Sequence, residues 1–331
     1  MVGRMSGATA PRPALGGAAR LIAKRVALAL LTLLLVSVVI FTISGLLPGD
    51  AAQEVLGQGA TPDQVAALRH EMGLDRPGPV RYVRWLGAIV AGDPGTSIVA
   101  NKPVAEIISE RLPNTLTLAA LSALFAVPFA FLIGISAAIR RGSKLDRALN
   151  VLTLSMVALP EFLIATIAVL ILSVKLLWLP AITLVPQDPT PAAFARAYAM
   201  PVLVLGIGVI AQLSRMIRAA IIAELDRPYV EMARLKGVRP ARLIVRHVLP
   251  NAVGPIVNAM ALSLSNLFGG AIIVETIFSY PGLASLMVNA VTSRDMPLLQ
   301  ACAMIFCATY LLLVLIADTI AILANPRLRH G

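Results

Sequence analysis

Charged residues are scarce in this sequence, since only 14% of its 331 residues are Asp, Glu, Lys or Arg. Hydrophobic residues make up 58% of the chain, and its mean hydropathy is +0.85. A composition this apolar excludes an ordinary soluble globular protein and indicates a chain that lies largely within a membrane.

Cysteine and histidine are also rare. The two cysteines, Cys302 and Cys307, lie five residues apart in an apolar run, so on a helix they point about 140° apart. This spacing disfavours a metal pair or a disulfide and favours a packing role. The three histidines, His70, His247 and His330, lie outside the long apolar runs. These residues supply no constellation of nucleophile, base and metal ligands, so the sequence predicts neither a membrane enzyme nor a metal site.

Long apolar runs dominate what is present. A helix needs about 20 apolar residues to cross a bilayer, and five uncharged runs have about this length: 26–47, 112–139, 197–214, 248–274 and 296–317. A sixth run, 148–174, is broken only by Glu161. The sequence therefore predicts an all-α integral membrane protein with six transmembrane helices.

Basic residues mark one side of this predicted bundle. The segment between the fourth and fifth runs carries eight basic and three acidic side chains, whereas residues 48–111 carry six basic and eight acidic ones. Because cytoplasmic loops carry the excess of Lys and Arg, both termini are predicted to be cytoplasmic. The same rule explains the net charge of +11, so we expect membrane lipid, and not nucleic acid, around the chain.

The predicted organisation has four parts. Residues 1–19, rich in Gly, Ala and Pro, form a disordered cytoplasmic tail, and residues 20–47 form the first transmembrane helix. That run is too long for the apolar region of a cleaved signal peptide. Residues 48–111 form an external helical segment that caps the outer mouth, and residues 112–327 form a five-helix core that includes a cytoplasmic loop, 224–250.

The cytoplasmic loop has a helical pattern of its own. Pro228 suits the first turn of a helix, and Gly237 suits a left-handed cap that ends it. One face then carries Tyr229, Met232, Ala233 and Lys236. A second short helix is expected from Pro240, and Pro250 is expected to break the chain before the membrane run resumes. A helix of about 8 residues is unstable alone, so this one packs either on a partner or on anionic lipid.

A family resemblance rests on this loop. Glu231-Met232-Ala233, then Gly237, then His247-Val248-Leu249-Pro250 resembles the Glu-Ala-Ala loop signature of ATP-binding cassette (ABC) importer permeases. The loop departs from the signature at Met232, where the motif has alanine, and at His247, where it has isoleucine.

The resemblance extends over about residues 20–329 and points to the dipeptide/oligopeptide permease B-type branch. The segments that show this resemblance include Leu47-Pro48-Gly49-Asp50, Val274-Glu275-Thr276-Ile277-Phe278 with Pro281-Gly282-Leu283, and Arg294-Asp295 with Pro297. Two departures are Ala51, where that branch commonly has proline, and Glu161 after Pro160, where a small polar residue is usual.

The resemblance implies a permease core in the bacterial cytoplasmic (inner) membrane. Its implied partners are a homologous second permease subunit, two ABC ATPase subunits and an external solute-binding protein. The loop would form a coupling helix that sits in a groove of the ATPase, through Tyr229, Glu231, Ala233, Gly237, Leu249 and Pro250. The implied solutes are short peptides, with nickel or another small solute left open.

The sequence agrees with that division of labour because it contains no Gly-x4-Gly-Lys-Ser/Thr phosphate loop. The basic stretch at 140–144 has neither the spacing nor the preceding strand. We therefore expect no cofactor in this chain, with ATP bound by the partner subunits, and no enzymatic activity of its own.

Three polar residues are candidates for lining the pathway: Glu161, Gln212 and Asp318. For Asp318, an arginine partner or contact with cytoplasmic water is the favoured alternative. Small residues are expected to allow close helix packing: Gly134, Ala138, Gly206, Gly208, Gly269 and Gly270. An ion-coupled secondary transporter is the alternative function, although intramembrane histidines, which such proteins often use, are missing from the runs.

Overall fold

The computed structural model describes residues 15–46, 56, 59–71, 75–183 and 190–324. These residues are almost entirely helical, and the one strand-like pairing among them is an isolated bridge between Thr96 and Pro103. The predicted all-α fold is confirmed. The predicted disordered tail falls largely on residues 1–14, outside the described residues.

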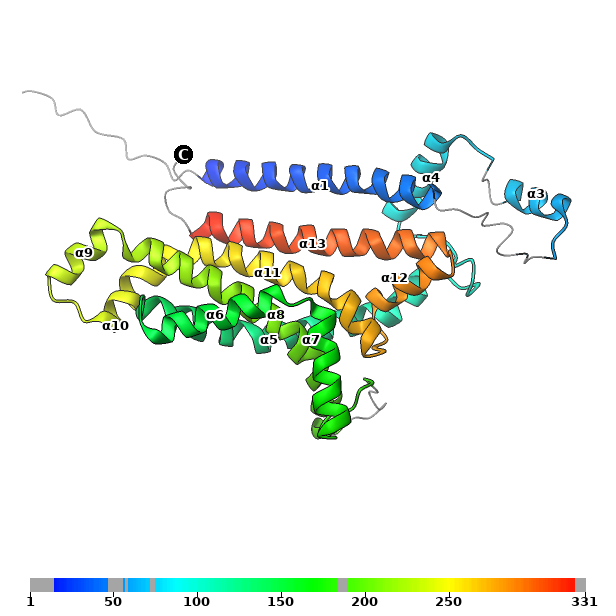
Figure 1. Cartoon of the computed structure of the whole chain (residues 1–331). Helices are drawn as coiled ribbons and strands as arrows, with labels where there is room; N and C mark the ends of the chain where they lie inside the picture. Colours follow the sequence, from blue (N-terminus) through cyan, green and yellow to red (C-terminus); the bar gives the residue numbers. More distant parts are fainter. Residues whose placement is uncertain (1–14, 47–55, 57–58, 72–74, 184–189, 325–331) are drawn as a thin grey trace, which may run out of the picture.

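Five helices of the described chain are long and apolar enough to cross a membrane. They are α1 (Leu15–Leu46), α5 (Val104–Ile139), α8 (Pro191–Leu225), α11 (Leu249–Ile277) and α13 (Met296–Ala324). They run side by side as a bundle in which α1 packs on α13, α13 on α11, α11 on α8, and α8 on α5 (Figure 1). Most of the buried apolar side chains lie on α5, α8 and α11, including Leu118, Leu213 and Val274.

The sixth predicted span is bent. Helix α6 (Lys144–Ala158) is followed by α7 (Glu161–Ala168) and a π-helical segment, η1 (Val169–Lys175), and the two parts meet at 99°. Pro160 explains the break, because proline disfavours helical geometry in the residue before it, and Leu159 is extended with ψ of 129°. The described chain therefore has five helices that are long and apolar enough to cross a membrane, or six candidate spans if the bent pair counts as one, and α7 projects from the bundle (Figure 1).

Two helices extend beyond the predicted apolar runs. Helix α1 begins at Leu15, and its membrane-length part, Ala19–Leu46, agrees with the predicted span 20–47 to within one residue. Helix α5 begins at Val104, ahead of the second run, and continues through Pro113 and Pro128 to Ile139.

The two ends of the bundle carry different elements. Helices α9 (Pro228–Leu235) and α10 (Pro240–Leu243) lie at the end where α1 starts and α13 finishes (Figure 1). Helices α3 (Pro62–Glu71), α4 (Gly78–Val90) and α12 (Leu283–Thr292) lie at the opposite end. This arrangement is consistent with a cap and a loop on opposite membrane faces, while the assignment of those faces stays a prediction.

Aromatic contacts hold α4 on α1. Tyr82 packs edge-to-face and Trp85 at a tilt against Phe41, with ring centroids 5.5 and 5.4 Å from it. The Tyr82 and Ser37 hydroxyls are hydrogen-bonded at 2.8 Å. Helix α4 is therefore attached to α1 through side chains of amphipathic character, which suit a membrane boundary.

Glycine allows two of the closest helix contacts. A Cβ on Gly134 would lie 2.6 Å from the Ser214 carbonyl oxygen, and one on Gly206 would lie 2.8 Å from the Phe125 ring. The close-packing prediction is confirmed at these two positions. It is wrong at Gly269, where no such neighbour lies within 4 Å.

A bidentate ion pair fastens α6 to α8. Arg218 donates to both carboxylate oxygens of Asp146, at 2.7 and 2.8 Å, and the Gly142 amide donates to the same carboxylate at 3.0 Å. The Asp146 side chain is only 5% exposed. A buried carboxylate that is satisfied on both oxygens stabilises one arrangement of the two helices.

We expect Asp146→Asn to lower the free energy of unfolding by about 2 kcal/mol, because it removes the charge from these hydrogen bonds. Asp226→Asn removes a comparable pair with Arg141, but both side chains there are more than half exposed. That control should cost less than about 1 kcal/mol. Thermal unfolding of the purified chain compares the two variants, and equal effects would contradict the prediction.

Candidate functional site

The loop between α8 and α11 forms the two predicted short helices. Pro228 lies in the first turn of α9, and Gly237 ends that helix with φ of +76°. The Gly237 amide donates to the Arg234 carbonyl and the Val238 amide to the Ala233 carbonyl, as a glycine cap requires. Both features of the predicted helix are confirmed.

The predicted break at Pro250 is wrong. Helix α10 continues through a π-helical segment, η2 (Ile244–Val248), directly into α11. Pro250 stands in the first turn of α11. The loop and the membrane helix therefore form one continuous helical path.

The two faces of α9 differ. Val230 and Ala233 are buried against the bundle, with 0% and 9% of their surface exposed. Met232 and Leu235 are apolar and point outward, 55% and 77% exposed. Glu231 is also exposed. A helix at the tip of the bundle that leaves two large apolar side chains uncovered has the character of a docking element.

Tyr229 ties α9 to both neighbouring spans. Its hydroxyl donates to the Glu224 carboxylate at 2.8 Å and lies 3.3 Å from the His247 carbonyl oxygen. Partial burial of the phenol, together with this hydrogen bond, raises the pKa of Tyr229 to about 12, so it stays a donor at neutral pH. The side chain links the end of α8, the start of α9 and η2.

The predicted coupling residues thus have distinct positions. Glu231 faces outward, Ala233 faces the bundle, and Leu249 packs partly against the core. Sequence reasoning missed Leu235, the most exposed apolar residue of α9. A signal was available, since Leu235 does not lie on the face predicted to carry Tyr229, Met232, Ala233 and Lys236.

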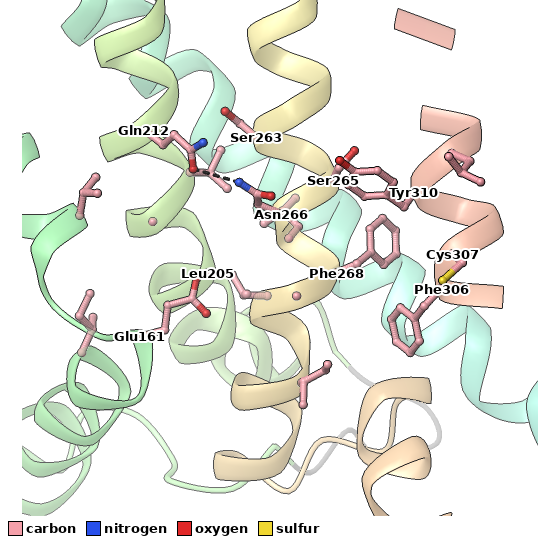
Figure 2. Close-up of a pocket in the computed structure, with 18 of the residues that line it drawn as sticks. Glu161, Leu205, Gln212, Ser263, Ser265, Asn266, Phe268, Phe306, Cys307 and Tyr310 are labelled. Carbon is pink, nitrogen blue, oxygen red and sulfur yellow. Dashed lines mark hydrogen bonds between the residues drawn. The ribbon is translucent and has the colours of Figure 1, made fainter. Parts of the chain in front are cut away.

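A second candidate site is a cavity of about 670 Å³ beside α11. Its lining comes from α1, α6, α7, α8, α11, α12 and α13, and Figure 2 shows the main side chains. Glu161 and Gln212 both line it, and their predicted place in a translocation pathway stays a prediction. Asp318 is not part of this lining; it pairs with Arg25 at 2.8 Å, which is the favoured alternative for that residue.

Polar groups of α8 and α11 meet inside this cavity. The Asn266 amide donates to the Gln212 amide oxygen at 3.1 Å (Figure 2). Ser263 and Ser265 are 1% and 2% exposed, and within the described chain their hydroxyls have no hydrogen-bond partner. Sequence reasoning missed these three α11 residues, although three polar side chains within four positions of an apolar run were a usable signal.

Glycine makes room for the Glu161 carboxylate. A Cβ on Gly270 would lie 2.7 Å from one Glu161 oxygen, and a Cβ on Gly208 would lie 3.5 Å from the other. The carboxylate thus reaches from α7 to the surfaces of α8 and α11 (Figure 2). Glu161 is the acidic residue among the described residues that line this cavity. The other polar side chains there carry amide, hydroxyl or thiol groups.

An apolar helical bundle, a helical loop that resembles the Glu-Ala-Ala signature and a cavity along α11 are the features expected of an ABC importer permease. The binding-protein-dependent transport system inner membrane component family matches residues 130–330. The N-terminal component of the same kind of system matches residues 18–119. The chain belongs to this family.

Curated relatives are similar to this chain over nearly its whole length. A putative peptide transport system permease protein of Brucella abortus (strain 2308) is 34% identical over 310 residues, which are 94% of this chain and 99% of the relative. A glutathione transport system permease protein of Salmonella typhi is 36% identical over 299 residues, 90% of this chain and 95% of the relative.

The fold is similar to that of a solved transporter, the inward-facing MetNI methionine ABC transporter. One structure has a TM-score of 0.53 at 18% identity, covering 66% of this chain and 96% of that one. Family membership decides against the ion-coupled secondary transporter, and the chain is a multi-pass permease of an ABC importer.

Proposed function

We propose that this chain is half of the translocation pore of an ATP-driven importer for short peptides. It would lie in the bacterial cytoplasmic membrane with both termini inside. It would pair with a homologous second permease, two ABC ATPase subunits and an external solute-binding protein. The relatives named for peptide and glutathione transport support the substrate class.

The observation that carries this proposal is the uncovered apolar tip of α9. The motif loop places Met232 and Leu235 outward at one end of the bundle, while Val230 and Ala233 anchor the same helix from below. A groove on an ATPase that accepts such a helix would gain the free energy of burying both side chains.

The mechanism we infer is alternating access. When the two ATPases close on ATP, they would displace α9, and the Tyr229 bonds to Glu224 and His247 would carry that displacement to α8 and to η2. Since η2 continues into α11 without a break, the helices that line the cavity would move together and open it outward. The external segment would meet the solute-binding protein.

Co-purification tests this proposal. The tagged chain, extracted gently from its native membrane, should bring with it an ATPase that contains a phosphate loop and a second permease, identified by mass spectrometry. Glu231→Lys reverses an exposed charge on α9 and should weaken ATPase recovery by about tenfold, if the carboxylate makes a charge-assisted contact. Recovery of the second permease should not change.

An uptake assay tests the proposed substrate class. Proteoliposomes that contain the purified complex should accumulate radiolabelled tri-alanine only with internal ATP and the solute-binding protein. A stable chain that is recovered alone at every detergent strength would contradict the coupling role and would return α9 to a lipid-surface helix. An intact complex that hydrolyses ATP but takes up no peptide would contradict the substrate class alone.

A further inference from the structure

The Glu161 carboxylate has no protein counter-charge in the part of the chain that the structure describes. The cavity lining there contains no Lys, Arg or His. Glu161 makes no hydrogen bond or ion pair with the described residues, whereas Asp146 and Asp318 are paired with arginines. An ionisable residue inside a membrane bundle is costly unless it faces water or a partner, and this one faces the cavity.

Two local explanations account poorly for this placement. Glu161 is in the first turn of α7, where a negative charge complements the helix dipole. However, its carboxylate accepts no backbone hydrogen bond there and lies instead against Gly208 and Gly270. A packing role would need no charge, and Gly270 must remain without a side chain to accommodate this one.

The neighbouring groups extend the same pattern. The Gln212–Asn266 pair uses one donor and one acceptor on each other, and each amide keeps further hydrogen-bonding capacity. The cavity thus presents one anionic acceptor and two neutral amide side chains, as suits a solute that carries a positive charge beside amide groups.

We propose that Glu161 makes the translocation pathway selective for charge: its carboxylate binds a positively charged group of the passing solute, while the Gln212–Asn266 pair contacts adjacent amide groups. This inference rests on the proposed importer function and adds to it a preference for basic over acidic peptides. It predicts that a single negative charge in the cavity raises the local concentration of cations and lowers that of anions.

Cys307 provides a probe within the cavity. It lines the same cavity and is partly exposed, whereas Cys302 is buried. In the purified complex, a cationic and an anionic methanethiosulfonate reagent should label Cys307 at rates whose ratio favours the cation. Glu161→Gln should lower that ratio by about tenfold, since one charge is removed from a partly enclosed site. Taking the ratio cancels any common change in thiol reactivity.

A rescue variant controls for a structural effect. The space beside Gly208 admits a Cβ at ordinary contact distance from Glu161, so Gly208→Asp should return a carboxylate to nearly the same place. In the Glu161→Gln background it should restore the labelling ratio to within about threefold of the original. In uptake, Ala-Lys-Ala should be preferred over Ala-Glu-Ala by the original complex and by the rescued double variant, and not by Glu161→Gln.

Each outcome has a distinct meaning. A labelling ratio unchanged by Glu161→Gln would overturn the inference. Loss of the second permease from the purified Glu161→Gln complex would also overturn it, because the carboxylate would then pair with that subunit. If the labelling ratio falls and recovers as expected but the original complex transports neither peptide, the peptide proposal fails and the cation-binding site stands.

Discussion

The double substitution Met232→Asp with Leu235→Asp should reduce ATPase capture and ATP-driven uptake by at least about thirtyfold. Both side chains are more than half exposed on α9, so the new charges meet water in the isolated chain. In a docked complex the same charges would be buried against an apolar groove, which costs several kcal/mol. Capture is measured by co-purification at fixed detergent strength, and uptake in proteoliposomes.

Two controls separate docking from folding. Val83→Asp places the same charge on α4, another short helix at the opposite end of the bundle, at a position that is 68% exposed. It should leave ATPase capture unchanged. Val230→Asp places the charge on the buried face of α9, so it should lower thermal stability. If the double variant captured the ATPase and took up solute normally, or if Val83→Asp lost as much ATPase capture as the double variant, α9 would not be the ATPase docking site.

The sequence was sufficient for features that depend on local pattern. Apolar runs of the right length predicted the straight spans, because a bilayer imposes a minimum helix length. Gly237 predicted the end of α9, because a left-handed cap favours glycine at a definite place. Pro160 and Glu161 interrupted one run, and the chain bends there, but the angle of 99° depends on what α7 packs against.

Tertiary partners were beyond the sequence pattern. The Asp146–Arg218 pair joins residues 72 positions apart, and Arg25 reaches Asp318 across 293 positions. One chain without related sequences contains no signal for such pairings. The candidate pathway residues illustrate this: Glu161 and Gln212 share a cavity, whereas Asp318 is held by an arginine. Asn266 could have been noticed as a polar residue beside Ser263 and Ser265 in an apolar run, but its hydrogen bond to Gln212, 54 positions away, could not.

The largest loss of stability should follow from a buried carboxylate that joins three helices at the end of the bundle opposite α9. Glu275, near the end of α11, is fully buried. It accepts hydrogen bonds from the Thr115 hydroxyl of α5 at 2.6 Å and from the Ser285 amide of α12 at 2.8 Å. Thr115 in turn accepts from the Leu283 amide. The carboxylate thus fixes the start of α12 against α11 and α5.

Glu275→Ala should lower the free energy of unfolding by about 4 kcal/mol, because it leaves buried donors unsatisfied and a cavity in their place. Thr276→Ala is the matched control: the next residue is exposed and its hydroxyl bonds only within its own helix. It should cost less than about 0.5 kcal/mol. Heating in the presence of a thiol-reactive dye reports unfolding through the buried Cys302, in a Cys307→Ser background.

A substitution at Gly282 tests whether the Glu275 carboxylate itself fixes the start of α12. The atoms nearest to a Cβ built on Gly282 all belong to the Glu275 side chain and overlap it, while the Gly282 backbone is extended and places no conformational demand on glycine. Gly282→Ala should therefore destabilise the original chain by about 2 kcal/mol through overpacking. In the Glu275→Ala background the same substitution should cost almost nothing, because the new methyl group enters the space that the carboxylate left. Additive losses in this double-mutant cycle would mean that α12 is positioned by other contacts and that Glu275 is only one buried side chain among many.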